Sequence, residues 1–391
     1  MKFNTWLHTS PLVVAIYLVN LLVSFHYFFV IYINSSFISQ YVSERSIGVL
    51  YITGSLISVI LFAYFIRILR KTGNVRLTAL FIAVEALSLG ALAFIEQTEL
   101  ILCFFTLHLV ISPVIYLNLD IFLEKIIKQE AITGSARGLF LTMINIAQVS
   151  SPILMGILLV HNEYWKAYIV SVGFLLFAFV LLVTQLHLFK DPEYVHYTLH
   201  QMKQRLLGSR AFFNVFMAQF LLRFFYAWMV IYTPLYLFKY IGFSWSEIGI
   251  IFTIMLVPFL ILEFPLGRVA DLFSCEKEML IVGFVILGGT VALMSFITEP
   301  SFILWAILLF CTRVGASLVE VGSESFFFKH VDGEQATTIS IFRATRPAAY
   351  ILAATVASVI LLAIPLQWSF LVLSLVMFGG IHYALALRDV R

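Results

Sequence analysis

The chain has 391 residues, of which 62% are hydrophobic, 12% are charged and 39 are Phe. Soluble domains carry about 25% charged residues, so this composition excludes an ordinary soluble enzyme and indicates a polytopic membrane protein. The net charge of +3 is too small to indicate a nucleic-acid partner, and the three Cys residues show neither CxxC nor metal-ligand spacing.

Long apolar segments follow one another along the whole chain. A helix needs roughly 20 mostly apolar residues to cross a bilayer, and helix is the expected state because lipid offers the backbone no hydrogen-bond partners. The first segment is too long for the apolar core of a cleavable signal peptide, so we expect it to be retained. Twelve helices are predicted, near residues 11–34, 47–66, 77–95, 100–119, 138–160, 165–188, 211–236, 247–266, 279–297, 300–322, 340–363 and 367–387.

The positions of Lys and Arg predict the orientation in the membrane. With the N-terminus inside, nineteen of the 24 basic residues fall in inner segments and three in outer ones. Because cytoplasmic segments carry the excess of basic residues, we expect both termini in the cytoplasm and an inner (plasma) membrane location. The longest polar stretch, residues 189–210, is the predicted cytoplasmic linker between two six-helix bundles, 1–188 and 211–391.

The last six segments repeat the first six about 200 residues later. Polar residues of helix 1 match polar residues of helix 7, and the same holds for helices 4 and 10. The matched sets are Asn20, Ser24 and Tyr27 with Gln219, Arg223 and Tyr226, and His108 and Ser112 with Arg313 and Ser317. Such a duplication is typical of transporters, whose binding sites lie between the two repeats.

Two loops carry halves of one motif. The segment after helix 8 reads Gly267-Arg-Val-Ala-Asp271, and the loop after helix 2 keeps Lys71 and Gly73. Here the chain resembles the major facilitator superfamily, which has a G-x-x-x-D-R/K-x-G-R/K-R/K motif between helices 2 and 3 and often a weaker copy between helices 8 and 9. Each copy departs from the pattern, but both stand at the correct places, and the resemblance covers nearly the whole chain.

The resemblance implies an all-α fold of two six-helix bundles that work as a monomer, with helices 1, 4, 7 and 10 around the substrate path. It also implies that the motif controls closure on the cytoplasmic side. We therefore expect two groups of gate residues: Gly267, Arg268 and Asp271 with Arg137, and Glu324 with Arg343 and Arg346. Positive-inside charges without a gate role are the alternative.

Two arginines fall inside predicted helices, Arg223 in helix 7 and Arg313 in helix 10. A charge in hydrocarbon costs at least about 2.5–3.5 kcal/mol and usually marks a functional site. An anionic substrate could neutralise these arginines; pairing with Glu85, Glu263 or Glu320, or a mixture of both roles, is the alternative. The predicted substrate-binding residues are Arg223, Arg313, Tyr226, Gln219, Asn20, Tyr27 and Ser317.

Proton coupling requires a group whose proton affinity changes as the site opens and closes. Glu320 is our first choice because it shares a helix face with Arg313 and Ser317. His26 and His108 come second because His titrates near neutral pH, although a buried His that only hydrogen-bonds its neighbours is the alternative.

These patterns predict a secondary active transporter of a small solute. We expect the solute to be an organic anion whose transport is coupled to protons. A drug or cation efflux antiporter is one alternative, since Ala147-x-x-x-Ser151-Pro152-x-x-x-Gly156 is similar to an antiporter element of the same family. A non-transporting protein of the same fold is the other. The chain lacks a Walker loop, and we expect no enzyme activity, metal or cofactor, and no partners beyond the solute and the lipid bilayer.

Overall fold

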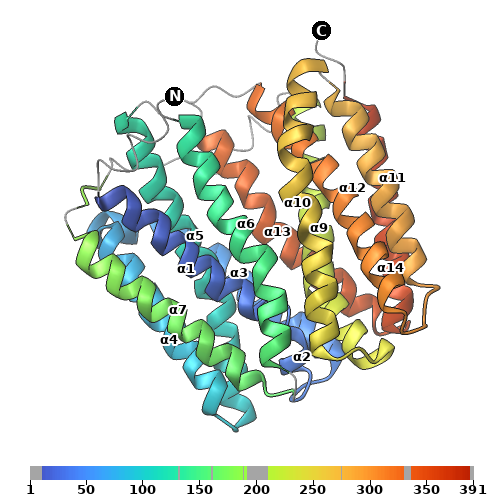
Figure 1. Ribbon diagram of the computed structural model, residues 1–391, viewed down its shortest axis with the longest axis horizontal. Coiled ribbons are helices and arrows are strands. Elements are labelled where there is room, and N and C mark those ends of the chain that lie inside the picture. The colour runs from blue at the N-terminus through green and yellow to red at the C-terminus, as the bar shows by residue number, and fades with distance from the viewer. Residues whose placement is uncertain are drawn as a thin grey trace. The chain divides into compact units, whose positions relative to one another are not determined.

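The computed structural model describes residues 11–130, 133–159, 162–187, 189–191, 210–273, 275–329 and 336–387. All regular structure in these ranges is helical (Figure 1). Most of the predicted linker lies outside them. The chain forms two compact units: Met1–Tyr41 with Thr53–Val195, and Val42–Ile52 with His196–Arg391. The first turns of one helix, α3, therefore group with the second unit and its remainder with the first.

The first unit is built around α1. This helix packs against α5, α6 and α7, and α4 packs against α5 and α7, as the blue to green ribbons of Figure 1 show. The helices are α1 (Pro11–Val30), α2 (Asn34–Ile38), α3 (Glu44–Thr72), α4 (Asn74–Phe94), α5 (Thr98–Glu130), α6 (Thr133–Leu158) and α7 (Tyr164–Gln185).

The second unit repeats this packing. Here α9 packs against α12, α13 and α14, and α11 packs against α12 and α14. Exchanging α1, α4, α5, α6 and α7 for α9, α11, α12, α13 and α14 converts one set of contacts into the other, so the sequence repeat is also a repeat of packing. The elements are α9 (Arg210–Tyr236), the π-helix η1 (Leu237–Ile241), α10 (Trp245–Phe273), α11 (Glu276–Met294), α12 (Phe302–Lys329), α13 (Ala336–Ile360) and α14 (Leu366–Leu385).

Nine helices of the described residues are long and apolar enough to cross a membrane. Three shorter apolar segments, Ser46–Phe62, Thr142–Leu158 and Thr345–Ile360, fall on predicted helices 2, 5 and 11. The all-α polytopic fold is therefore confirmed, whereas twelve spans remain a prediction at these three segments.

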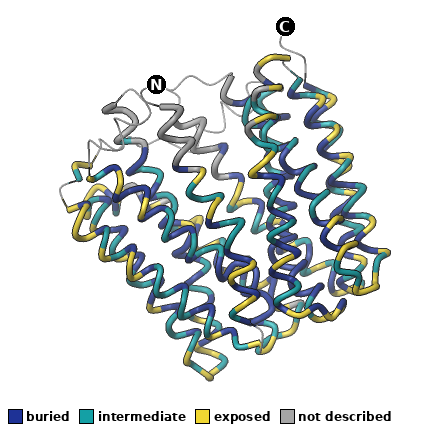
Figure 2. The backbone as a smooth tube through the Cα atoms, viewed as in Figure 1, coloured by how far each residue is buried: buried dark blue, intermediate teal, exposed yellow. Residues whose placement is uncertain are grey.

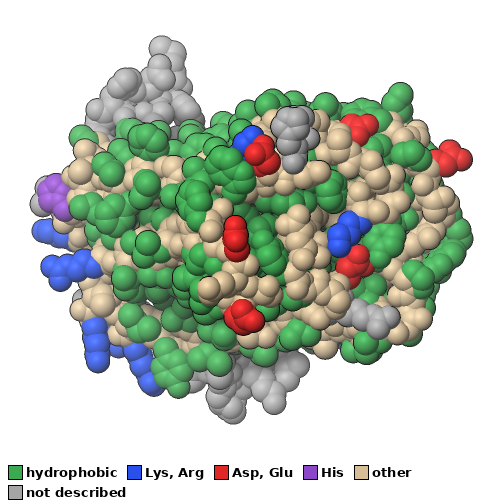
Figure 3. All heavy atoms as spheres, turned by 90° about the horizontal axis from the view of Figure 1, so that it is seen from below, with side chains coloured by type: hydrophobic (Ala, Val, Ile, Leu, Met, Phe, Trp, Pro, Cys, Tyr) green, Lys and Arg blue, Asp and Glu red, His purple; other side chains and the backbone are tan. Residues whose placement is uncertain are grey.

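Outward-facing apolar side chains suit a lipid surround. Figure 2 shows buried and exposed residues alternating along the helices, and exposed positions include Leu87 (71%), Phe94 (73%) and Phe177 (69%). Hydrophobic side chains cover much of the face drawn in Figure 3, with acidic and basic side chains scattered among them. A soluble protein rarely exposes apolar patches of this extent, so burial of these side chains in lipid is the consistent interpretation.

Close backbone contact joins α11 to α12 in the second unit. A Cβ atom added to Gly315 would lie 2.8 Å from the carbonyl oxygen of Gly283, and one added to Gly283 would lie 2.8 Å from the carbonyl oxygen of Gly315. Small residues allow such an approach because no side chain separates the two backbones. This contact holds α12, which carries the charged residues discussed next.

Candidate functional site

Arg223 of α9 and Glu320 of α12 form an ion pair inside the second unit. Arg223 Nη2 lies 3.0 Å from Glu320 Oε1, and the Tyr226 hydroxyl donates to Glu320 Oε2 at 2.8 Å. The Arg223 and Glu320 side chains remain 22% and 20% exposed. The alternative that Glu320 pairs with an intramembrane arginine therefore holds for Arg223 in this conformation.

Tyr226 lies between the two intramembrane arginines. The guanidinium carbons of Arg223 and Arg313 are each 5.6 Å from the centre of the Tyr226 ring, and that of Arg313 is 5.3 Å from the centre of the Phe225 ring. Arg313 is only 3% exposed. An aromatic face attracts a cation more strongly when both are shielded from water, so these rings help to hold Arg313 in an apolar span.

Polar side chains one helical turn away extend this cluster. The side-chain amide of Gln219 lies 2.8 Å from Ser323 Oγ. When the amide nitrogen faces Ser323, the amide oxygen accepts a hydrogen bond from Arg223 Nη2, also at 2.8 Å. Glu324 Oε1 lies 3.8 Å from Arg223 Nη2 and is 45% exposed. Four residues singled out in the sequence, Gln219, Arg223, Tyr226 and Glu320, thus meet at the contact between α9 and α12.

The other predicted binding residues make different contacts. Ser317 is fully buried, and its hydroxyl has no hydrogen-bond partner among the described residues. In the first unit, Asn20 donates to the Phe140 carbonyl at 3.0 Å, and the Tyr27 ring meets the Tyr116 ring edge-on at 5.4 Å. Their assignment to a substrate site stays a prediction.

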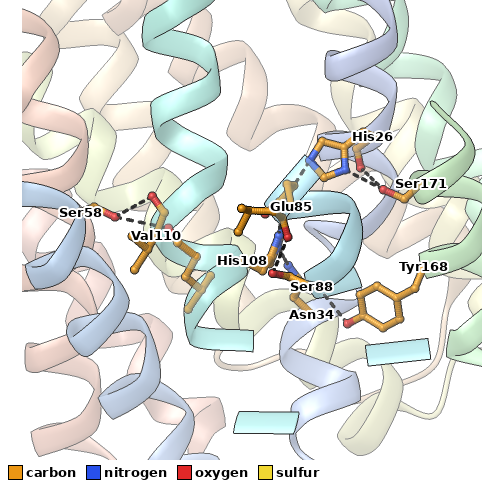
Figure 4. A network of polar contacts seen from close by, with 11 residues as sticks. His26, Asn34, Ser58, Glu85, Ser88, His108, Val110, Tyr168 and Ser171 are labelled. Atoms are coloured by element: carbon orange, nitrogen blue, oxygen red, sulfur yellow. Dashed lines mark hydrogen bonds and ion pairs between the residues drawn. The ribbon is translucent and has the colours of Figure 1, made fainter. Parts of the chain in front are cut away.

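A second polar cluster is buried in the first unit, where Glu85 of α4 contacts two histidines (Figure 4). Glu85 Oε1 is 2.5 Å from His108 Nδ1 and 3.2 Å from His26 Nε2. Glu85 is fully buried, and the two histidines are 1% and 2% exposed. The sequence pattern marks each histidine separately and marks Glu85 as a partner for arginine, and it carries no signal that all three meet.

Helices α1, α2 and α7 supply the next partners of this second cluster. His26 Nδ1 lies 2.7 Å from Ser171 Oγ, which also donates to the His26 carbonyl at 3.0 Å. Asn34 Nδ2 lies 3.0 Å from His108 Nε2, and the Tyr168 hydroxyl donates to Asn34 Oδ1 at 3.1 Å. The sequence alone gave no signal for Asn34, Tyr168 or Ser171.

Only some of the predicted gate residues have described side chains. The side chains of Arg137, Arg268, Asp271 and Arg343 lie outside the described residues. A Cβ atom on Gly267 would meet no heavy atom within 4 Å among those described, so no close helix approach is recorded there. Arg346 is exposed, and Glu324 has Arg223 nearby. The gate therefore remains a proposal.

The loop with the first half-motif is organised by a distant carboxylate. Gly73 has φ of +78°, a left-handed backbone that favours glycine. The next backbone N–H, that of Asn74 at the start of α4, donates to Asp191 Oδ1 at 2.9 Å. A carboxylate at a helix N-terminus satisfies a free N–H and meets the positive end of the helix dipole.

Asp191→Ala should lower the free energy of unfolding by about 0.3–1 kcal/mol, the usual value of a charge at an exposed helix end. Asp191→Asn keeps an acceptor oxygen and should lose less. Chemical denaturation of the purified protein compares the three; equal stability of Asp191→Ala and the unchanged protein would refute this role.

Among the described residues, no group of three His, Cys, Asp or Glu side chains is arranged to hold a metal ion. The contacts recorded in both clusters are ion pairs and hydrogen bonds.

The family model described as Major Facilitator Superfamily matches residues 215–391. This stretch holds α9 from its first turns onward, with α10 to α14, and it belongs to that superfamily of membrane transporters. The resemblance inferred from the half-motifs is thus confirmed for this part of the chain, and the match together with the long apolar helices supports an integral membrane protein. No curated protein matches the chain in sequence.

Proposed function

We propose that the protein is a secondary active transporter that carries a small organic anion together with a proton. The observation that supports this most is the pairing of Arg223 with Glu320 and Tyr226 in helices of apolar composition. Charges are rare in such helices and are usually functional. The family is one of transporters, which agrees with the proposal.

Competition for Arg223 would couple the two solutes. Arg223 keeps its proton at all relevant pH values, so it always needs a counter-charge, which Glu320 now supplies. A substrate carboxylate that displaces Glu320 leaves a carboxylate in poorly hydrated surroundings, and Glu320 then takes up a proton. The Arg223 guanidinium thereby exchanges the Glu320 carboxylate for the substrate carboxylate while Glu320 binds one proton. One monoanion and one proton therefore move together, and no net charge is transported.

Tyr226 and Gln219 would keep the site ordered during this exchange. Tyr226 donates to Glu320, and a hydroxyl can instead accept from the protonated acid. Gln219 accepts from Arg223 Nε and Nη2, which helps the guanidinium to keep its position when its carboxylate partner changes. Arg313 beside the same ring adds a second positive charge that attracts the anion.

Exposure of this site to alternate sides requires movement of the two bundles relative to each other. We propose that Gly267, Arg268 and Asp271 with Arg137, and Glu324 with Arg343 and Arg346, close the cytoplasmic side. The proposed bundles are residues 1–188 and 211–391, joined by the linker at 189–210.

A screen of purified protein against carboxylates, phosphates, sugars and organic cations tests the substrate class. We expect carboxylates to raise the melting temperature, more strongly in acidic buffer, because a protonated Glu320 frees Arg223. Stabilisation by organic cations alone would instead support an efflux antiporter. Binding and transport of no solute would support a non-transporting protein.

A further inference from the structure

The hydrogen bonds around Glu85 determine which atoms of His108 carry protons. The Tyr168 hydroxyl donates to Asn34 Oδ1, which leaves the Asn34 amide nitrogen facing His108 Nε2. An amide nitrogen only donates, so His108 Nε2 must accept. His108 therefore has its proton on Nδ1, where it donates to Glu85 Oε1 at 2.5 Å.

The hydrogen bonds of Ser171 likewise determine which nitrogen of His26 carries a proton. Ser171 has one hydroxyl proton, and giving it to the His26 carbonyl makes Ser171 Oγ the acceptor for His26 Nδ1–H. In the opposite arrangement, the Ser171 and carbonyl oxygens would face each other as two acceptors at 3.0 Å. A neutral imidazole with its proton on Nδ1 has a bare nitrogen at Nε2.

That nitrogen lies 3.2 Å from Glu85 Oε1. A bare nitrogen and a carboxylate oxygen repel each other at this distance, so one further proton must lie between them. It makes either an imidazolium with a carboxylate or an imidazole with a carboxylic acid, and both forms are neutral overall.

We propose that His26, Glu85 and His108 form a proton-binding site in the first unit, separate from Glu320, which holds one exchangeable proton between His26 and Glu85. Release of this proton to water leaves a carboxylate with two neutral imidazoles and a net charge of −1. Such a lone buried charge is costly, so in this conformation the loaded form is favoured, and release requires water to reach the contact between α1 and α4.

Nothing else recorded around Glu85 can neutralise that charge. The titratable groups facing it are His26 from α1 and His108 from α5, with Tyr168 of α7 one step further, and no Lys or Arg of the described residues pairs with it. Its second oxygen, Oε2, is buried and has no hydrogen-bond partner among the described residues. That oxygen is an acceptor for an incoming proton.

The second unit has no counterpart of this site. Positions 201 to 205 residues after Glu85 are Ile286 to Thr290, none of them charged, and the position matching His108 is Arg313. The proton site therefore belongs to one half of a duplicated fold. Its use in energy coupling rests on the proposed transport function, whereas proton binding itself does not.

Histidine-selective ¹⁵N NMR of the purified full-length protein tests the site without any substrate. Two results are expected: His108 in the Nδ1–H tautomer, and His26 with a proton on Nδ1 and an Nε2 resonance that moves toward the unprotonated position as pH rises between about 5 and 9. The variants His26→Gln and His108→Gln assign the signals. His26 as a neutral Nε2–H tautomer, or an Nε2 signal that is constant over this range, would overturn the proposal.

Glu85→Gln provides a variant that should fold, because its amide oxygen can accept from His108 Nδ1–H and also from His26 once His26 takes the neutral Nε2–H form. We expect it to abolish the titration of His26, whereas His382→Gln, at an exposed position of α14, should remove only its own signal. A His26 titration that persists in Glu85→Gln would contradict a shared proton. If the His26 and His108 signals behave as expected but the protein transports no solute, only the proposed function is refuted.

Discussion

Arg223→Gln is expected to reduce proton-coupled uptake of the anion about 10- to 100-fold while the protein still folds. Hydrogen bonds to charged groups contribute about 1.5–3 kcal/mol, and about 1.4 kcal/mol corresponds to a factor of ten in binding. Folding should survive because Glu320 is 20% exposed and keeps the Tyr226 hydroxyl as a donor. Initial rates in proteoliposomes measure the effect.

Matched variants separate substrate binding from structural pairing. Arg210→Gln removes an exposed arginine at the start of the same helix and should leave uptake unchanged. Glu320→Gln should retain exchange of anion for anion but lose its dependence on pH, because no carboxylate remains to take the proton. If the double variant Arg223→Gln/Glu320→Gln recovers uptake, the pair is structural and our assignment of Arg223 fails.

Gly315→Ala is expected to destabilise the second unit by about 1–3 kcal/mol, the usual cost of overpacking. The added methyl group would meet backbone atoms of α11, the Gly283 oxygen at 2.8 Å and the Leu287 nitrogen at 3.0 Å. Backbone atoms cannot turn aside as a flexible side chain can, so α11 and α12 must separate. Thermal unfolding in detergent measures the loss.

Gly289→Ala is the control, because a Cβ atom there meets no heavy atom within 4 Å among the described residues. Both residues lie inside helices, and Ala is preferred to Gly in a helix by about 1 kcal/mol. Opposite signs are thus expected for the two substitutions. Equal effects would show that helix propensity, rather than contact between α11 and α12, decides the outcome.

Apolar run length and the repeat predicted the helices well, but not where they end. Each of the twelve predicted helices overlaps one long helix of the structure. The first, placed at 11–34, is interrupted by a turn at residues 31–33 before α2. The fourth, placed at 100–119, continues as α5 to Glu130, since a helix can continue past the apolar core into polar surroundings where hydropathy no longer marks it.

The residue types of the candidate sites could be predicted from the sequence, but the contacts between those residues could not. Arg223, Glu320 and Tyr226 were recognisable as polar groups in apolar segments, yet their meeting depends on how α9 lies against α12. Likewise His26, Glu85 and His108 come from three helices, and spacing within one helix carries no information about contacts between helices. Ser171 and Tyr168 are ordinary residues of an apolar helix until that packing is known.

Proton movement in proteoliposomes tests the central claim most directly. Vesicles containing purified protein and a pH-sensitive dye receive an inward gradient of the anion that stabilises the protein best, with the membrane potential clamped at zero. We expect inward acidification that tracks anion entry, saturates with anion concentration and does not change when a potential is imposed. Anion entry without proton entry, or entry that follows the imposed potential, would contradict it.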